Sequence, residues 1–374
     1  MYRVLLDSKM SSKKTFHITI LPGDGIGPEV VHVGLKVLRA VAEAVSLSLR
    51  IEEGMVGGAA LDRCGTPLPQ ETIDKVEISD AVLLGAVGND RWAKVDYAVR
   101  PEAGLLELRR RMDLFANLRP VRVFPQLIGA SSLRPEKVEG TDIMIVRELI
   151  GGLYFGEPRG IERIEKGEER AFNTMVYTTS QIARVARRAY SLAMERKRHL
   201  TSVDKANVLE VSLLWRKVVS GLQAEYPEVT LRHLYVDNCA MQLIRDPRQF
   251  DVILTENLFG DILSDEAAMI PGSIGMLPSV SLGAHSSLYE PVHGSAPDIA
   301  GKDVANPIAT VLSVAMMYRF AFSEEHAAQR IEGAVTRVLD LGYRTPDIYS
   351  EGDCMVGTHE MGDRILEQLC EIAE

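Results

Sequence analysis

The chain has 374 residues, of which 46% are hydrophobic and 25% are charged, a composition typical of soluble globular proteins. This length favours two domains of moderate size over a single core. There are 52 acidic and 42 basic side chains, which give a formal net charge of −10. An acidic chain repels phosphate backbones and anionic lipids, so nucleic-acid and membrane-surface binding are disfavoured. We expect a cytoplasmic protein, with an organelle form that lacks its transit peptide as the alternative.

The cysteines and the apolar runs exclude two further classes of protein. Cys64, Cys239, Cys354 and Cys370 are far apart and form no zinc-binding pattern, so we expect unpaired thiols in a reducing compartment. The longest apolar run, residues 308–318, is too short to cross a membrane. The first dozen residues are too short and too charged for a secretory signal.

Helical and strand patterns alternate from the first apolar run onward. The spacing of apolar residues predicts strands over 17–21, 80–88, 141–149 and 251–260 and helices over 28–45, 102–112, 180–198 and 261–270. Such alternation predicts an α/β fold with a largely parallel sheet.

Residues 153–178 break this alternation. Their glycines, proline and alternating side chains predict an antiparallel hairpin, which is either an ordinary surface hairpin or an arm that clasps a partner subunit. No low-complexity linker separates two halves of the chain. The domain boundary must therefore lie inside the α/β pattern, in domains that exchange segments.

The stretch LPGDGIGPEV, residues 21–30, follows the first predicted strand and opens a helix. Gly23, Gly25 and Gly27 give G-x-G-x-G, and Pro28 occupies the place of the third glycine of a dinucleotide fingerprint. The stretch therefore does not match the glycine fingerprint of a Rossmann dinucleotide-binding fold. The remaining choices are a ligand site at a helix N-terminus and a tight turn between strand and helix.

Carboxylates in two other motifs are candidate metal ligands. Asp261 and Asp265 of DILSD are four residues apart and share one face of a helix, where two like charges favour a compensating cation. Oxygen ligands without His or Cys point to Mg²⁺ or Mn²⁺. Asp237 follows a predicted strand and is either a third ligand or a helix cap. The alternative for Asp261 and Asp265 is an acid at a helix N-terminus beside an unrelated exposed acid.

Basic and phenolic side chains supply candidate substrate ligands and proton carriers. Arg109, Arg119 and Arg147 could converge to bind carboxylates in bidentate fashion, or each could form a separate surface ion pair. Lys205 is either a base with a lowered pKa or a solvated lysine. Tyr154 is either a proton donor or a packed aromatic side chain.

Residues 289–307 form the densest polar stretch of the chain. Glycines and prolines in this segment predict an ordered binding loop. Asp298 could accept hydrogen bonds from ribose hydroxyls and would repel a 2′-phosphate, which favours NAD over NADP. Its alternative role is that of a turn residue after Pro297.

Together these motifs closely resemble the β-decarboxylating dehydrogenase family of isocitrate and isopropylmalate dehydrogenases, and within it the isopropylmalate enzymes of leucine biosynthesis. The resemblance covers almost the whole chain and rests on several blocks at once, among them GLLELRRRMDLFANLRP, RELIGGLYFGEPRG, SVDKANVLE, YVDNCAMQLI, FGDILSDEA, GSIGMLPSVSL and EPVHGSAPDIAG. It implies a two-domain α/β fold that is not a Rossmann fold. Residues 1–114 with 272–374 would bind the cofactor, and 115–271 would bind substrate and metal.

The resemblance also implies a homodimer, with an arm at about residues 153–178 and active sites shared between subunits. Arg109, Arg119 and Arg147 would hold the two malate carboxylates. Asp261 and Asp265, with Asp237 of the partner subunit, would bind Mg²⁺ or Mn²⁺ and the substrate. Lys205 of the partner subunit would take the hydroxyl proton as hydride leaves for NAD, and Tyr154 would protonate the enol after decarboxylation.

Substrate selectivity and cofactor binding are implied in the same way. Glu102, Leu105 and Leu106 match positions that recognise the isopropyl group and the nicotinamide side. Expected contacts of the nicotinamide half are Gly85, Ala86, Val87, Gly88, Asn89, Asp90, Arg91 and Trp92. Expected contacts of the adenosine half are Glu290, His293, Gly294, Ser295, Ala296, Pro297, Asp298, Ile299, Ala300, Gly301 and Asn306. Three departures from the family pattern, Ile150, Asn89-Asp90 and Glu256, fall near these contacts.

Two alternatives to oxidative decarboxylation of 3-isopropylmalate stay open. One is the same chemistry on isocitrate, homoisocitrate or tartrate, although the apolar pair Leu105 and Leu106 favours an alkyl substituent. The other is a nucleotide- and metal-binding protein without activity. The presence of both Lys205 and Tyr154 favours an enzyme.

Overall fold

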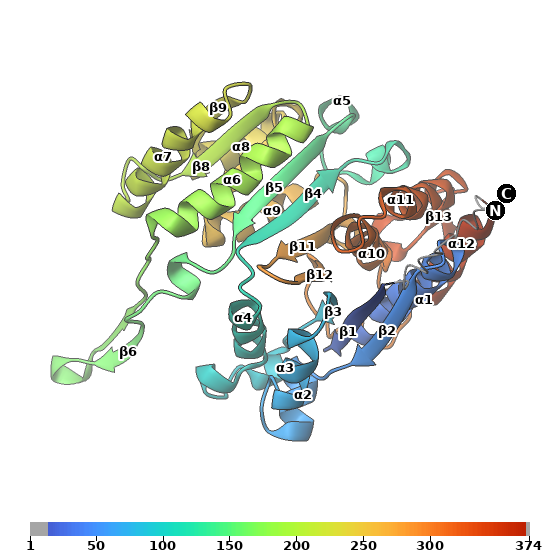
Figure 1. Cartoon of the computed structure of the whole chain (residues 1–374), viewed down its shortest axis with the longest axis horizontal. Helices are drawn as coiled ribbons and strands as arrows, with labels where there is room; N and C mark the ends of the chain where they lie inside the picture. The colour runs from blue at the N-terminus through green and yellow to red at the C-terminus, as the bar shows by residue number, and fades with distance from the viewer. Residues whose placement is uncertain (1–13, 372–374) are drawn as a thin grey trace, which may run out of the picture.

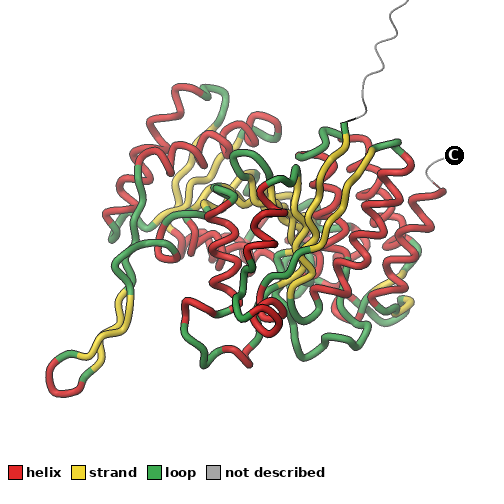
Figure 2. The backbone as a smooth tube through the Cα atoms, turned by 60° about the horizontal axis from the view of Figure 1, so that its bottom comes forward, coloured by secondary structure: helices red, strands yellow, loops and turns green. Residues whose placement is uncertain are grey.

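The computed structural model describes residues 14–371. The first dozen residues, for which no secretory signal is predicted, lie outside this range. A ten-stranded sheet runs through the molecule in the order β2-β1-β3-β12-β11-β4-β5-β10-β8-β9, and helices cover its faces (Figures 1 and 2). The strands are β1 Thr15–Gly23, β2 Ser48–Glu53, β3 Ala81–Ala86, β4 Ala116–Arg122, β5 Asp142–Glu148, β8 His199–Asp204, β9 Thr230–Tyr235, β10 Val252–Thr255, β11 Pro278–Leu282 and β12 Ser287–Pro291. The predicted α/β class is confirmed.

The sheet is parallel at both ends and antiparallel in the middle. β2, β1, β3 and β12 run parallel to one another, as do β5, β10, β8 and β9. The pairs β12–β11, β11–β4 and β4–β5 are antiparallel. One continuous sheet therefore joins the two regions predicted as separate domains. The division at residues 114/115 and 271/272 stays a prediction.

Twelve α-helices are found in the described residues. They are α1 Gly27–Ala44, α2 Gly57–Cys64, α3 Gln70–Glu77, α4 Pro101–Arg111, α5 Pro135–Val138, α6 Thr179–Glu195, α7 Glu210–Leu222, α8 Val236–Arg245, α9 Asn257–Ala268, α10 Ile308–Phe320, α11 Glu325–Asp340 and α12 Thr358–Glu371. The longest apolar run forms α10, which is buried on all sides from Ile308 to Tyr318. Within residues 14–371, no helix combines the length and the apolar character that a membrane crossing requires.

The hairpin β6 Gly160–Arg163 and β7 Glu169–Phe172 projects from the body of the protein (Figures 1 and 2). Its strands are antiparallel, as predicted, and nearly all of their residues are exposed. A further two-stranded sheet, β13 Tyr343–Arg344 with β14 Cys354–Met355, lies near α12. The clasping of a partner by the hairpin stays a prediction.

Helix α9 begins four residues before the predicted start at residue 261. Strand β10 ends at Thr255, and the Glu256 side chain accepts hydrogen bonds from the backbone N–H groups of Leu258 and Phe259. A carboxylate at this position satisfies donors that the first turn of a helix leaves free, so the helix starts at once. Glu256, which departs from the family pattern, thus caps the helix that carries Asp261 and Asp265.

The opening stretch 21–30 packs against two distant segments by close backbone contact. Gly23 has φ +73°, and a Cβ there would lie 2.0 Å from the Ala86 carbonyl oxygen. A Cβ on Gly25, at φ +57°, would lie 1.9 Å from the Ser295 carbonyl oxygen. These glycines let the first turn touch both β3 and the loop after β12.

We expect the Gly85→Ala substitution to destabilise the fold by about 2 kcal/mol through overpacking. A Cβ on Gly85 would lie 2.3 Å from the Pro22 carbonyl oxygen and 2.7 Å from the Gly27 Cα, which are backbone atoms that cannot turn aside. Urea unfolding measures the loss. Gly129→Ala is the control, because its Cβ would meet nothing within 4 Å. Equal unfolding free energies for the two variants would contradict this packing.

Candidate active site

Three arginines converge at the centre of the sheet. In the β4–β5 pair, Asn117 lies opposite Arg147 and Arg119 lies opposite Ile145, so both arginines point to the same face. Arg109 reaches them from the last turn of α4. Exposure is 7% for Arg109, 5% for Arg119 and 1% for Arg147. Buried guanidinium groups require partners, and their partners define the site.

Helix α9 presents Asp261 and Asp265 to these arginines. Asp261 Oδ1 lies 2.5 Å from Arg147 Nη1 and 3.4 Å from Arg119 Nη2. Asp265 Oδ1 lies 3.5 Å from Arg119 Nη1. Arg109 Nη2 instead donates to Glu290 Oε1 at 3.1 Å. The structure therefore brings together the three arginines predicted to hold the substrate carboxylates and two of the three predicted metal ligands.

Neighbouring polar groups that the sequence analysis did not single out hold the arginines in place. Arg147 donates to the side chain and backbone oxygens of Asn257, at 2.8 and 3.0 Å. Arg119 donates to Asn117 Oδ1 and Ser264 Oγ, each at 2.6 Å. Ser264 lies inside the DILSD motif, and Asn257 follows the cap Glu256. These positioning residues were visible only as polar residues beside recognised motifs.

Burial and charge set the protonation of this cluster. Burial, with Arg119 adding to it, lowers the pKa of Arg147 to about 10. Burial would raise the pKa of Asp261, but Arg147 and Arg119 outweigh it and hold that pKa below the usual value. Burial raises the pKa of Asp265, and Arg119 only partly opposes it. Asp261 is thus the ionised partner of the arginines at neutral pH.

Tyr154 completes the cluster from the turn after β5. Its hydroxyl donates to Asp261 Oδ2 at 2.8 Å. Burial, and then the nearby Asp261 charge, raises the pKa of Tyr154 to about 12. The phenol is therefore protonated at neutral pH and can donate a proton to a group that replaces Asp261.

Lys205 and Asp237 form a separate pair. Lys205 Nζ donates to Asp237 Oδ1 at 2.7 Å, between the loop after β8 and the first turn of α8. In the described chain, neither side chain bonds to the arginines, Tyr154, Asp261 or Asp265. Residues 14–371 also contain no group of three or more His, Cys, Asp and Glu side chains placed to hold a metal ion. One chain alone does not assemble the predicted set Asp237, Asp261 and Asp265.

Asp261 and Asp265 nevertheless fit a hard divalent cation as a partial ligand set. They lie one turn apart on the same face of α9, and both supply only oxygen donors. The Asp265 side chain is 57% exposed, and its ion pair with Arg119 is long at 3.5 Å, so its oxygens are accessible. A further donor must come from substrate, water or another chain.

A cavity of about 420 Å³ gathers two of the predicted cofactor segments. Val87, Gly88 and Trp92 line it from one side, Gly294, Ser295 and Pro297 from the other, and Glu102 from α4. Ser295 Oγ also donates to the Gly88 carbonyl oxygen. Residues separated by two hundred positions thus form one hollow, although their contacts with a cofactor stay predictions.

Asp24 holds this hollow together and was not recognised in the sequence. Its carboxylate accepts hydrogen bonds from the backbone N–H groups of Gly58 at 2.8 Å, Ala59 at 2.7 Å and Gly88 at 2.8 Å. The side chain is buried. A lone Asp between two glycines was its only signal.

A smaller hollow of about 260 Å³ adjoins the opening turn. Gly25, Pro28 and Glu29 line it with Gly301, Asp303 and His359. Glu29 Oε1 accepts a hydrogen bond from the Gly301 N–H at 2.8 Å. Asp298 is exposed in the same loop. The opening motif therefore forms a wall beside the loop 289–307.

A buried acidic pair lies behind the arginine cluster and was also missed. Tyr177 donates to Glu148 Oε2 at 2.9 Å and lies 3.4 Å from Glu256 Oε2. Glu148 and Glu256 are 1% and 3% exposed. Burial raises the pKa of both carboxyls. The sequence indicated only that Glu148 and Glu256 each lie at the end of a strand, and not that they form a pair.

Comparison with known proteins decides the family. Residues 17–365 match the family described as isocitrate/isopropylmalate dehydrogenase. The chain belongs to this family. It is therefore a decarboxylating dehydrogenase that acts on a small molecule, with a nicotinamide cofactor and a divalent metal.

Three relatives illustrate how close the similarity is. The chain is 58% identical to a 3-isopropylmalate dehydrogenase of Synechococcus over 367 residues, which cover 98% of this chain and 99% of the relative. It is 56% identical to the 3-isopropylmalate dehydrogenase of Methylococcus capsulatus, over 95% of this chain and 99% of that enzyme. The crystal structure of isocitrate dehydrogenase from the same bacterium superposes with a TM-score of 0.85 at 34% identity, over 95% of this chain and 99% of that one.

The acidic pair predicts a pH dependence of stability. Because burial raises the folded-state pKa of Glu256 above its usual 4.5, its favourable contribution is present below pH 4.5 and is lost as pH rises through the folded pKa. The stability of Glu256→Gln relative to wild type should thus increase between pH 4.5 and 8, by on the order of 1 kcal/mol.

Urea unfolding at both pH values measures this difference. Glu139→Gln, at an exposed glutamate, serves as the control and should show no such trend. If the stability of Glu256→Gln relative to wild type stays constant or decreases as pH rises, burial does not raise the pKa of the Glu256 carboxyl.

Proposed function

We propose that the protein catalyses the NAD-dependent oxidative decarboxylation of (2R,3S)-3-isopropylmalate to 4-methyl-2-oxopentanoate and CO₂, a step of leucine biosynthesis. The observation that carries this proposal is the buried cluster of Arg109, Arg119 and Arg147 beside Asp261 and Tyr154. It combines carboxylate recognition, metal ligands and a protonated phenol in one place.

The arginines suit a substrate with two carboxylates. Arg147 and Arg119 now share the single oxygen Oδ1 of Asp261, and Arg109 is paired with Glu290. Incoming carboxylates can take over these guanidinium donors in planar, bidentate geometry. Asp261 is then free to bind a cation. A cation is favoured there because Asp261 and Asp265 lie on one helix face and their negative charges repel each other.

Apolar side chains next to Arg109 favour an alkyl substituent. Leu105 and Leu106 lie four and three residues before Arg109 on α4, so they lie one turn away on the same side of the helix. Both are half-buried, with surface left for a ligand. The relatives from M. capsulatus agree with this choice, since the chain is 56% identical to its isopropylmalate enzyme and 34% identical to its isocitrate enzyme.

The cofactor proposed is NAD, with Mg²⁺ or Mn²⁺ as the metal. The hollow lined by Gly88, Glu102 and Ser295 leads from Glu102 on α4 to the loop 289–307. Exposed Asp298 on that loop favours ribose hydroxyls over a 2′-phosphate. When bound, NAD accepts the hydride, and the cation polarises the substrate oxygens while CO₂ leaves.

Two side chains of the protein carry the protons. Lys205 Nζ would take the proton of the substrate hydroxyl, and Tyr154 Oη would deliver one to the enol. Tyr154 is already in the site, hydrogen-bonded to Asp261. Lys205 with Asp237 is not, so we propose that both enter the site of a partner subunit.

A homodimer is supported by apolar side chains near this lysine. The exposed apolar side chains here are Met241 and Ile244 of α8, Ile262 of α9 and Met269 directly after α9, with exposed fractions of 61%, 44%, 57% and 47%. Ile161 on the projecting hairpin is 74% exposed. Large apolar side chains gathered at a surface mark protein interfaces. A second copy covering α8 and α9 would bring its own Lys205 and Asp237 toward Asp261.

A substrate panel tests the proposed function. With NADH formation as the readout, kcat/KM should be higher for 3-isopropylmalate than for isocitrate, homoisocitrate or tartrate. Chelation of divalent cations should abolish turnover. Faster turnover of isocitrate than of 3-isopropylmalate would contradict the proposal.

The Leu105→Ala substitution should lower the preference for 3-isopropylmalate over unsubstituted malate by about tenfold, because it removes apolar contact with the alkyl group. Leu341→Ala, at an exposed leucine far from α4 in sequence, is the control.

A further inference from the structure

A second, larger cavity lies on the opposite face of the strands that carry the arginines. It has a volume of about 610 Å³ and is lined by residues of β4, β5, α6, α10 and α11, and we call it the rear cavity. Pro120 and Arg122 of β4 and Asp142 and Met144 of β5 line it. In register, Pro120 lies opposite Met144 and Arg122 opposite Asp142. Since side chains alternate along a strand, these residues face away from Arg119 and Arg147.

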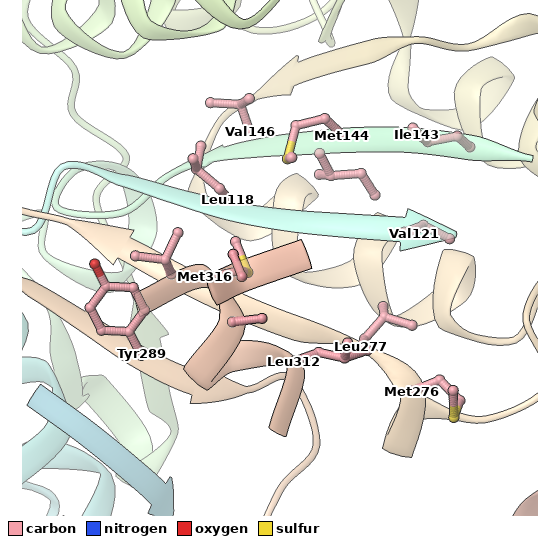
Figure 3. Packing of buried hydrophobic residues seen from close by; sticks show 14 of the residues in the cluster. Leu118, Val121, Ile143, Met144, Val146, Met276, Leu277, Tyr289, Leu312 and Met316 are labelled. Atoms are coloured by element: carbon pink, nitrogen blue, oxygen red, sulfur yellow. The ribbon is translucent and has the colours of Figure 1, made fainter. Parts of the chain in front are cut away.

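One wall of the rear cavity is apolar and adaptable. Met144 of β5, Leu312 and Met316 of α10 and Met276 line it, and Figure 3 labels all four among the packed hydrophobic side chains of this region. Phe124 adds an aromatic face. Methionine side chains adjust their shape to an apolar ligand, and a volume of this size admits a small molecule.

Most charged side chains around the rear cavity are paired. Arg196 is paired with Asp142 and Asp251, both at 2.8 Å. Arg319 is paired with Glu325 and Glu332, both at 2.7 Å. Each of these two arginines contacts two carboxylates, so neither guanidinium group is left free for a ligand.

Two arginines and one glutamate remain. Arg188 and Arg122 line the rear cavity and form no ion pair or hydrogen bond with the described residues, and Glu195 is exposed and likewise unpaired. Arg188 Nε is buried and has no hydrogen-bond partner. A buried donor without a partner is unfavourable, so an acceptor at this point is favoured. The four arginines and four carboxylates that line the rear cavity balance in number, and the guanidinium groups without a carboxylate partner are those of Arg188 and Arg122.

We propose that the rear cavity binds an aliphatic monocarboxylate, with its carboxylate on Arg188 and Arg122 and its chain against the methionine-lined wall. The ligand carboxylate would supply the acceptor that the unpaired guanidinium groups of Arg188 and Arg122 lack. A second negative charge, as on a phosphate or a dicarboxylate, would add to the repulsion from Glu195 and the other carboxylates of the lining. The ligand lies on the same strands as the arginine cluster but on the opposite face, so this site is distinct from the active site and does not depend on the proposed function.

Isothermal titration with octanoate as the probe tests this site. Octanoate should bind the wild-type protein, and Arg188→Met should weaken binding about tenfold or more, because it removes the charged donor and keeps an unbranched side chain. The neutral 1-octanol should bind at least about tenfold more weakly than octanoate. Arg187→Met is the control, since its guanidinium is paired with Glu225 outside the cavity and binding should not change.

Three outcomes would overturn the proposal. They are the absence of octanoate binding to wild type, equal binding by wild type and Arg188→Met, and equal affinity for octanol and octanoate. Equal binding by Arg188→Met would place octanoate elsewhere, for example on Arg109, Arg119 and Arg147. If Arg188→Met does not fold, as judged by circular dichroism, Arg122→Met replaces it and the same criteria apply.

Discussion

The burial of three guanidinium groups around Asp261 is the interaction on which the active site depends. Arg109, Arg119 and Arg147 repel one another, and removing each from water is costly. Asp261 and Glu290 oppose this charge, and Asn117, Asn257 and Ser264 accept further hydrogen bonds from Arg119 and Arg147. The same excess of positive charge is what a dicarboxylate needs. The folded protein therefore holds the three guanidinium groups in position before the substrate binds, although burying them is unfavourable.

The antiparallel middle of the sheet makes this cluster possible. β4 and β5 pair so that Arg119 and Arg147 share one face, while β11 links them to the strands beside the cofactor loops. Helix α9, which carries the carboxylates, packs against β4 and β5, and α4, which carries Arg109 and the leucine pair, ends shortly before β4. The opposite face of the same two strands lines the rear cavity. Because side chains alternate along a strand, the arginine cluster and the rear cavity lie on opposite faces of the same two strands.

Local patterns in the sequence predicted much of the fold, but contacts between distant residues escaped them. Helix α6 and strands β3 and β5 follow directly from apolar periodicity and match the structure. The start of α9 was missed because it depends on the cap Glu256, and the antiparallel pairing of β11 with β4 leaves no local signal. Motifs identified the arginines, Tyr154, Asp261 and Asp265. Asp24, Glu148 and Asn257 escaped because a buried polar residue is recognised by its partners, which lie up to 110 positions away. The roles proposed for Lys205 and Asp237 involve a second chain, which no single-chain pattern or structure contains.

The sharing of active sites between subunits is tested most directly by mixing two inactive variants. Lys205→Ala and Asp261→Asn should each abolish turnover alone. In a mixed dimer, one site combines the intact Asp261 of one chain with the intact Lys205 of the other. Random assembly makes half of the dimers mixed, so co-expression should restore about a quarter of the wild-type activity per chain. A mixture that forms dimers and stays inactive would show that Lys205 and Asp261 act within the same chain, and would contradict this account.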